Sequence, residues 1–93
     1  MEITYDTEKR AWTLDHRGLD FEDAPQVFSG PRYTVIDDRR AYTEVRFQTY
    51  GLHGDRLIQV VWTLRGDARH IISMRKCNDR EKARFQDRLD PSR

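Results

Sequence analysis

The chain has 93 residues, which is enough for one domain with a modest hydrophobic core, so we expect a single domain over residues 1–93. Its 17 basic and 16 acidic residues leave a formal net charge of only +1, and bulk charge therefore indicates neither a nucleic-acid partner nor a membrane partner. The single cysteine cannot form an intrachain disulfide, and no apolar run is long enough for a signal segment or a membrane helix. We therefore expect a cytoplasmic protein without a membrane segment.

The N-terminal third combines a strand pattern with two helix patterns. Residues 2–5 alternate polar and apolar side chains, which is typical of a short strand. Asp6 or Thr7 can then cap a helix that ends before Gly18, because glycine readily adopts the left-handed conformation that follows a helix. A second helix is predicted to begin after Asp20, and a proline within it predicts that it is short or kinked.

The rest of the chain shows β patterns followed by one charged helix. Strands are predicted at residues 33–36, 44–52, 56–65 and 68–76. Short turns with glycine separate the last three strands, so these strands must be antiparallel. Asn78 and Glu81 have the spacing of a capping box, which predicts a final helix to about Leu89.

This order of elements predicts an α+β fold with a curved antiparallel sheet. Two N-terminal helices and one C-terminal helix are expected to pack on the sheet and cover one of its faces. The other face would then be a concave, polar surface. The register of the strands cannot be read from the sequence, so the side chains that meet on this face remain open.

Several charged residues on the predicted strands could gather on the polar face. Glu44 and Arg46 lie on one side of their strand and would be joined by Arg65. The last strand would add one of two alternating pairs, which are Arg69 with Arg75 or His70 with Lys76.

Such a cluster would suit RNA cleavage without a metal ion. A carboxylate or a histidine could remove the proton from the 2′-hydroxyl, and arginines could stabilise the charge that develops on the phosphorane. The alternative is a solvated sheet face with cross-strand pairs of glutamate and arginine. The three histidines, His16, His53 and His70, do not have the spacing of metal ligands, so we expect no metal site.

The same residues resemble the BrnT family of ribonuclease toxins over almost the whole chain. The first part of the family pattern is kept at Asp6, Lys9, Gly18, Phe21, Ala24 and Phe28. The middle part is kept at Glu44, Arg46 and Gly51, and the last part is kept at Thr63, Arg65, Ile71, Ile72, Ser73, Met74, Arg75, Lys76 and Glu81. The sequence departs from the pattern at Thr13, Arg17, His70 and Phe85.

The resemblance implies a RelE-like fold and a metal-independent endoribonuclease that inhibits translation, with no cofactor. It also implies neutralisation by a BrnA-like ribbon-helix-helix antitoxin in a heterotetramer, which would contact operator DNA only through the antitoxin. Two other functions stay open, an antitoxin-binding module with little catalysis and a nucleic-acid binder that does not cleave.

The shared strand faces and the matched motifs together suggest roles for individual residues. Arg46, Arg65 and Arg75 are predicted to contact the phosphate, and Glu44 is the candidate base. Lys9 is predicted to support them, and His70 is a further acid–base candidate. Additional RNA contacts are expected from Lys76, Arg69, Arg17 and His16.

Overall fold

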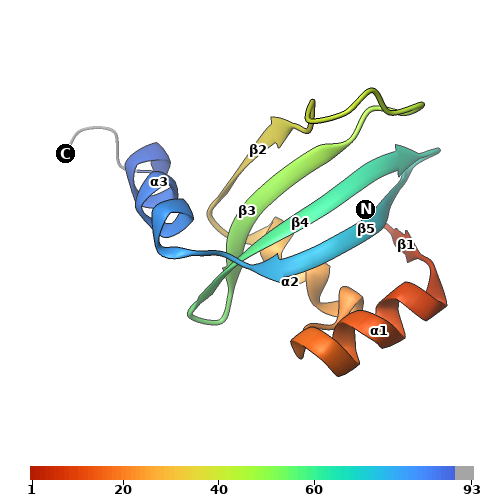
Figure 1. Cartoon of the computed structure of the whole chain (residues 1–93), viewed down its shortest axis with the longest axis horizontal. Helices are drawn as coiled ribbons and strands as arrows, with labels where there is room; N and C mark the ends of the chain where they lie inside the picture. The colour runs from red at the N-terminus through yellow and green to blue at the C-terminus, as the bar shows by residue number, and fades with distance from the viewer. Residues whose placement is uncertain (90–93) are drawn as a thin grey trace.

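The computed structural model describes residues 1–89, so the last four residues of the expected domain lie outside the described part. Five strands form one curved sheet in the order β1-β5-β4-β3-β2 (Figure 1). The strands are β1 (Ile3–Tyr5), β2 (Arg32–Ile36), β3 (Phe47–His53), β4 (Arg56–Arg65) and β5 (Ala68–Lys76). The helices are α1 (Thr7–Arg17), α2 (Ala24–Ser29), which follows a 3-10 turn at Phe21–Asp23, and α3 (Asp79–Leu89). The predicted order of elements is confirmed.

The helix ends follow from local side-chain chemistry. The Asp6 carboxylate accepts hydrogen bonds from the first backbone N–H groups of α1, and Gly18 ends this helix with a φ of 67°. Asn78 and Glu81 form the predicted capping box, because each side chain accepts from the backbone N–H of the other, at 2.8 and 2.9 Å. Proline stands in the first turn of α2, where its missing N–H costs no hydrogen bond.

The sheet is mixed, so the expectation of a purely antiparallel sheet is wrong at one edge. Strands β2 to β5 pair antiparallel as predicted. The edge strand β1 instead runs parallel to β5, with Ile3 opposite Arg69 and Tyr5 opposite Ile71. No short hairpin joins β1 to β5, so no turn in the sequence indicated whether β1 would run parallel or antiparallel to β5.

A β-bulge at Ile72 interrupts the alternation of β5. Val61 lies opposite Ser73, but the next residue of β4, Trp62, lies opposite Ile71, so Ile72 has no partner of its own. The side chains before and after the bulge are therefore out of phase.

Because of the bulge, neither predicted pair of β5 residues shares a face. His70 lies opposite Thr63 and Arg75 lies opposite Gln59, and both therefore project from the side of β4 that carries these two residues. Arg69 and Lys76 project from the other side. The strict alternation that predicted Arg69 with Arg75, or His70 with Lys76, is wrong at this point.

We call the side of the sheet that carries Ile58, Val60 and Trp62 the first face. The 3-10 turn and α2 cover this face with buried residues that include Phe21 and Phe28. The close approach of α2 requires glycine in β3, because a Cβ atom at residue 51 would lie 2.9 Å from a methyl group of α2.

The opposite side, which carries Gln59, Val61 and Thr63, is the second face. Helix α3 covers one end of this face through Phe85, which packs in a cluster with Tyr50 and Leu57. The expectation that all helices lie on one face is therefore wrong, since α2 and α3 lie on opposite faces of the sheet.

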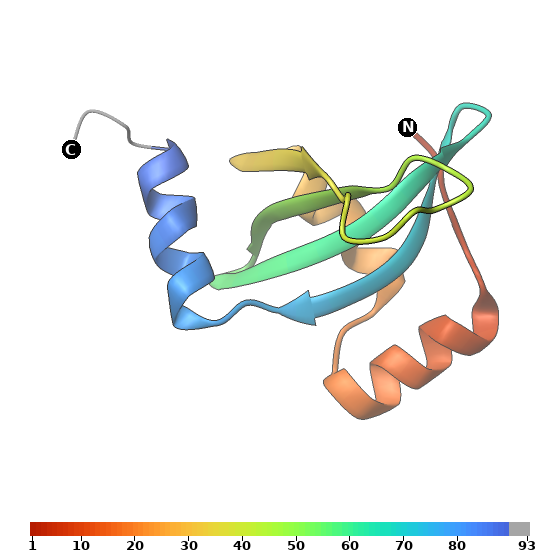
Figure 2. The ribbon, with the colours of Figure 1, turned by 45° about the horizontal axis from the view of Figure 1, so that its top comes forward.

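Strand β1 pairs with only the first part of β5, and helix α1 lies along the rest of that edge (Figures 1 and 2). The Lys9 ammonium donates to the backbone carbonyl of Ile72 at 3.5 Å, and the Arg17 guanidinium donates to that of Met74 at 2.8 Å. These side chains satisfy carbonyl groups on an otherwise open edge. Only Thr13 of this helix is buried.

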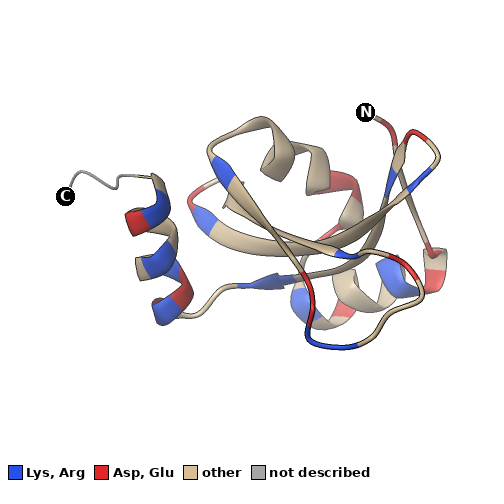
Figure 3. Cartoon of the chain, turned by 90° about the horizontal axis from the view of Figure 1, so that it is seen from above, with Lys and Arg blue, Asp and Glu red and all other residues tan. Residues whose placement is uncertain are grey.

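Charged residues of both signs are spread over the helices and loops, and they do not separate into one basic face (Figure 3). Every helix within residues 1–89 is too short or too polar to span a bilayer.

Candidate active site

The open end of the second face contains a cavity of about 350 Å³. Its walls are formed by Asp6, Lys9, Glu44, Arg46, Arg65, His70, Ile71 and Ile72. Five of the six predicted catalytic residues lie here, and they come from four different parts of the chain. Lys9 belongs to α1, Arg65 ends β4 and His70 lies in β5, whereas Glu44 and Arg46 precede β3.

Glu44 and Arg46 lie in the loop between β2 and β3, because β3 begins at Phe47 and the predicted strand start at residue 44 is wrong. Figure 2 shows this loop as it leaves β2 and turns back toward the sheet. The backbone N–H of Asp37 donates to the carbonyl of Arg46 at 2.8 Å, and the Thr63 hydroxyl donates to the carbonyl of Val45 at 2.6 Å. The first bond joins the two arms of the loop, and the second attaches the loop to the second face.

A buried carboxylate in this loop holds the side chains next to Arg46. Asp37 accepts two hydrogen bonds from the Arg39 guanidinium, at 2.7 and 2.8 Å, and one from the Tyr42 hydroxyl at 3.3 Å. The bonds from Arg39 lower the pKa of Asp37 to about 2. The Tyr42 ring then lies 4.1 Å from the Arg46 guanidinium, a distance at which the ring face attracts the cation. Sequence reasoning missed this arrangement, because an irregular loop carries no periodic pattern.

Arg65 is held less tightly than Arg46. Its guanidinium forms one ion pair with Glu44 at 3.6 Å, and the Arg65 side chain is 56% exposed. The separation leaves most of its N–H donors available to a ligand. The Nε of Arg46 is buried and has no hydrogen-bond partner within the described residues.

His70 is the titratable group in this cavity whose pKa is clearly shifted. Burial lowers its pKa below the ordinary value of 6.5, and the nearby Arg65 guanidinium lowers it further. Its Nδ1 is hydrogen-bonded to the Thr4 hydroxyl at 2.9 Å, which orients the ring. The imidazole is therefore neutral at pH 7 and can accept a proton.

The charges in the cavity favour an anionic ligand. Three cationic side chains, Lys9, Arg46 and Arg65, face two carboxylates, those of Asp6 and Glu44, which leaves a formal excess of one positive charge. The Asp6 carboxylate is already used by the first turn of α1. Among residues 1–89, no group of three or more His, Cys, Asp or Glu side chains is arranged to hold a metal ion.

Arg75 shares the second face with this cavity but does not line it. Its guanidinium forms two hydrogen bonds to the Glu81 carboxylate, at 2.8 and 2.7 Å. This contact lowers the pKa of Glu81 to about 2. The arrangement ties the end of β5 to the first turn of α3.

Two of the predicted RNA-binding residues lie on the first face, away from the cavity. The Arg69 guanidinium packs over Phe28 at 4.0 Å, and burial lowers its pKa. Lys76 is exposed near the opposite end of β5, beside the β3–β4 hairpin.

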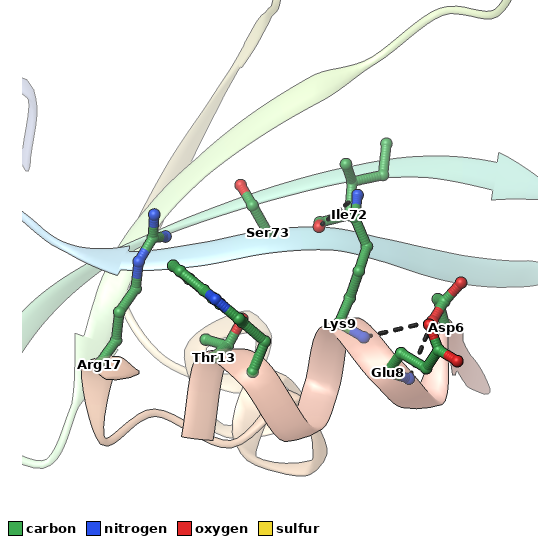
Figure 4. Close-up of a pocket in the computed structure, with 8 residues that line it drawn as sticks. Asp6, Glu8, Lys9, Thr13, Arg17, Ile72 and Ser73 are labelled. Atoms are coloured by element: carbon green, nitrogen blue, oxygen red, sulfur yellow. Dashed lines mark hydrogen bonds between the residues drawn. The ribbon is translucent and has the colours of Figure 1, made fainter. Parts of the chain in front are cut away.

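The other two predicted RNA-binding residues lie at the C-terminal end of α1. Arg17 lines a second cavity of about 500 Å³ between α1 and β5, where it is joined by Thr13 and Ser73 (Figure 4). Trp12 also lines this cavity. His16 stacks on the Trp12 ring at a centroid distance of 4.4 Å. Trp12 is 49% exposed and therefore lies at the surface.

The family model described as "Ribonuclease toxin, BrnT, of type II toxin-antitoxin system" matches residues 5–81. The match includes every residue named above in the first cavity, and it defines the class of protein as a ribonuclease toxin with an RNA target and an antitoxin partner. The chain belongs to the BrnT toxin family. No curated protein matches the chain at a significant level.

Proposed function

We propose that this protein is a metal-independent endoribonuclease that cleaves RNA in the cavity formed by Lys9, Glu44, Arg46, Arg65 and His70. The observation that carries this proposal is the arrangement of three cationic side chains around a neutral histidine in one open cavity. A neutral imidazole can act as the base, and the neighbouring cations can stabilise the negative charge that develops during transphosphorylation of RNA.

In the proposed reaction, His70 accepts the proton of the 2′-hydroxyl. The 2′-oxygen then bonds to the adjacent phosphorus and the bond from phosphorus to the 5′-oxygen breaks. This oxygen takes up a proton from solvent, and His70 returns its proton to solvent. The products are a 2′,3′-cyclic phosphate and a free 5′-hydroxyl. Lys9, Arg46 and Arg65 stabilise the negative charge that develops on the phosphorane oxygens.

Glu44 was the base expected from the sequence, and its ion pair with Arg65 supports a different role. A carboxylate 3.6 Å from this guanidinium restricts the orientation of Arg65, and we propose that Glu44 positions this arginine. His70 is the better candidate base, because burial lowers its pKa and so favours the neutral imidazole, which can accept a proton.

The biological setting that we propose follows from the family. The chain would inhibit translation by RNA cleavage, share a RelE-like fold, and be neutralised by a BrnA-like ribbon-helix-helix antitoxin in a heterotetramer. Operator DNA would be contacted only through this antitoxin. The family match and the α+β architecture with a mixed sheet support the setting.

The test compares two histidine variants in cells and in purified form. Wild-type protein, expressed under tight control in bacteria, should arrest growth, and the purified protein should yield RNA fragments with 2′,3′-cyclic phosphate ends. His70→Gln should lower the cleavage rate by a factor of about 10² to 10⁴. His53→Gln is the matched control, because this histidine lies in the β3–β4 hairpin beside Asp23, and it should cleave like wild type.

Equal activity of wild type and His70→Gln would exclude His70 as the base. Folded wild-type protein that binds an antitoxin but neither arrests growth nor cleaves RNA would replace the nuclease proposal by an antitoxin-binding module.

A further inference from the structure

We infer that the second cavity, between α1 and β5, is a nucleotide subsite in which one base of single-stranded RNA stacks on Trp12. This inference rests on the proposed function, because the subsite adjoins the proposed active site and would bind the nucleotide next to the cleaved phosphodiester.

The two cavities are neighbours along α1. Asp6, Lys9 and Ile72 line both of them. Figure 4 shows the Lys9 and Arg17 side chains as they rise from α1 toward β5, with Thr13 between them. These three residues are four apart, so they lie on one face of the helix, and Lys9 and Arg17 are about 12 Å apart along its axis. An RNA strand that occupies the first cavity can therefore continue along this face past Lys9 toward Arg17.

The way α1 is attached to the sheet explains why the second cavity is open. This helix contacts the β5 edge through two long cationic side chains, which reach the carbonyls of Ile72 and Met74. Short apolar residues would bring the helix closer, but α1 buries only Thr13. The remaining volume of about 500 Å³ lies in the range of ligand-binding pockets, which is about 300–1,000 Å³.

The walls of the second cavity match the chemistry of a nucleotide. His16 stacks on one face of the Trp12 indole, and Trp12 is still 49% exposed and lines the cavity, so a base can stack on the part of the ring that His16 leaves open. The Arg17 guanidinium lies 5.2 Å from the indole centroid and is fixed by its bond to Met74. A fixed cation beside the aromatic ring is suited to the phosphate of the same nucleotide.

Two hydroxyl groups can contact the edge of the base. Thr13 and Ser73 line the cavity from opposite sides, one from α1 and one from β5. Neither hydroxyl takes part in a side-chain hydrogen bond within residues 1–89, and each can donate or accept. Glu8 adds a carboxylate acceptor to the same walls.

The test measures RNA binding in the His70→Gln background, in which the RNA stays intact. The probe is a fluorescein-labelled single-stranded RNA of about ten nucleotides, and binding is followed by fluorescence anisotropy. Trp12→Ala should raise Kd about tenfold, because stacking on an aromatic side chain has an effect of this order. Trp12→Phe should retain most of the affinity.

Leu14→Ala is the matched control for this measurement. Leu14 is 46% exposed on the same helix and lines neither cavity, so its removal should leave Kd unchanged. Intrinsic fluorescence adds a direct readout. RNA should quench the emission of the Trp12-containing protein, and the quenching should disappear in Trp12→Phe, in which only the buried Trp62 remains.

The outcomes separate this inference from the proposed function. Equal Kd values for Trp12→Ala and its parent would overturn the subsite, even when wild type cleaves RNA. Binding that depends on Trp12, together with wild-type protein that does not cleave, would support the subsite and reject the nuclease. Absence of RNA binding would overturn both.

Discussion

One end of the second sheet face is covered by α3, whereas the other end is open and lined by cationic side chains. At the covered end, Phe85 packs with Tyr50 and Leu57. At the open end, His70 and Arg65 on the same two long strands face a cavity. Strands β4 and β5 run through both ends, and what covers or borders each end is the segment that follows or precedes these strands. A helix fixed by a capping box closes one end, and a loop held by Asp37 borders the other.

Arg75 and Arg65 illustrate what this difference means for a single residue type. Both were predicted to contact phosphate. Arg75 donates two short hydrogen bonds to Glu81, at 2.8 and 2.7 Å, and Arg65 keeps one loose contact with Glu44 at 3.6 Å. The location of the nearest carboxylate therefore decides whether an arginine on this face has donors free for a ligand.

The largest effect expected from this comparison of the two ends is the loss of cleavage when Arg65 is removed. Arg65→Ala should lower the rate of RNA cleavage by a factor of about 10² to 10³, because one donor to the phosphorane is lost. Its Tm should not change, because the side chain is 56% exposed. The cleavage rate and the thermal melting curve are measured on the same preparation. Arg75→Ala is the matched variant, and it should retain cleavage per folded molecule. A loss of cleavage in folded Arg75→Ala would show that Arg75, like Arg65, contributes to cleavage.

The next effect is on stability and concerns the covered end. Glu81→Ala should lower the free energy of unfolding by about 2–3 kcal/mol, because a helix cap and charge-assisted hydrogen bonds are lost. Urea denaturation of wild type and variant at pH 7 measures this difference. Cleavage per folded molecule should stay unchanged.

The contribution of Glu81 should also depend on pH. Its pKa is about 2 in the folded protein, against 4.5 as the ordinary value, so the folded state binds this proton more weakly than the unfolded state. The stabilisation is therefore complete above about pH 4.5 and is lost as the pH falls toward 2. A difference between wild type and Glu81→Ala that stays constant over this window would contradict the assigned ion pair.

A smaller effect is expected where the loop borders the open end. Tyr42→Ala should lower kcat/KM about tenfold, because the ring face that holds the Arg46 guanidinium is removed. Tyr42→Phe keeps the ring and loses only the bond to Asp37, and it should restore most of the rate. If Tyr42 positions Arg46, the change should fall on kcat more than on KM. Equal losses in the two variants would point to the hydroxyl and not to the ring.

The smallest effect should be seen in the titration of His70. NMR of the imidazole should give a pKa below 6.5 in wild type, and Arg65→Ala should raise it, because this guanidinium is the second cause of the shift after burial. The pKa should stay below 6.5, since burial remains. On the acid side, kcat/KM of wild type should fall as the pH drops through the pKa of His70. An acid limb that His70→Gln leaves unchanged would assign the titration to another group.

The parts of the fold that follow from local sequence were predictable. The limits of β4 and β5, the capping residues Asp6 and Asn78, and the turn glycines were all indicated by side-chain pattern. Long-range pairing was not predictable in this way. The parallel contact of β1 and the separation of α2 and α3 to opposite faces depend on which surfaces meet in three dimensions.

The candidate site was predictable as a set of residue types but not as an arrangement. Lys9, Glu44, Arg46, Arg65 and His70 were named from the sequence, and they do line one cavity. The predicted reason, alternation on strands, applies only in part, because Glu44 and Arg46 lie in a loop. Arg75 was named by the same reasoning, and its partner Glu81 was named as a helix cap and as part of the family pattern. No local pattern indicated that the two would meet.

The bulge at Ile72 divides β5 into two segments. The extra residue shifts the alternation of side chains by one position, so odd-numbered residues point to one face of the sheet before the bulge and to the other face after it. The segment before the bulge supplies His70 to the cavity, and the segment after it supplies Met74 to the core. Deletion of Ile72 would rejoin the phases, so that either the imidazole or the apolar residues would turn to the wrong side of the sheet. A single extra residue thus allows the site and the core to occupy one strand, each on the face that it needs.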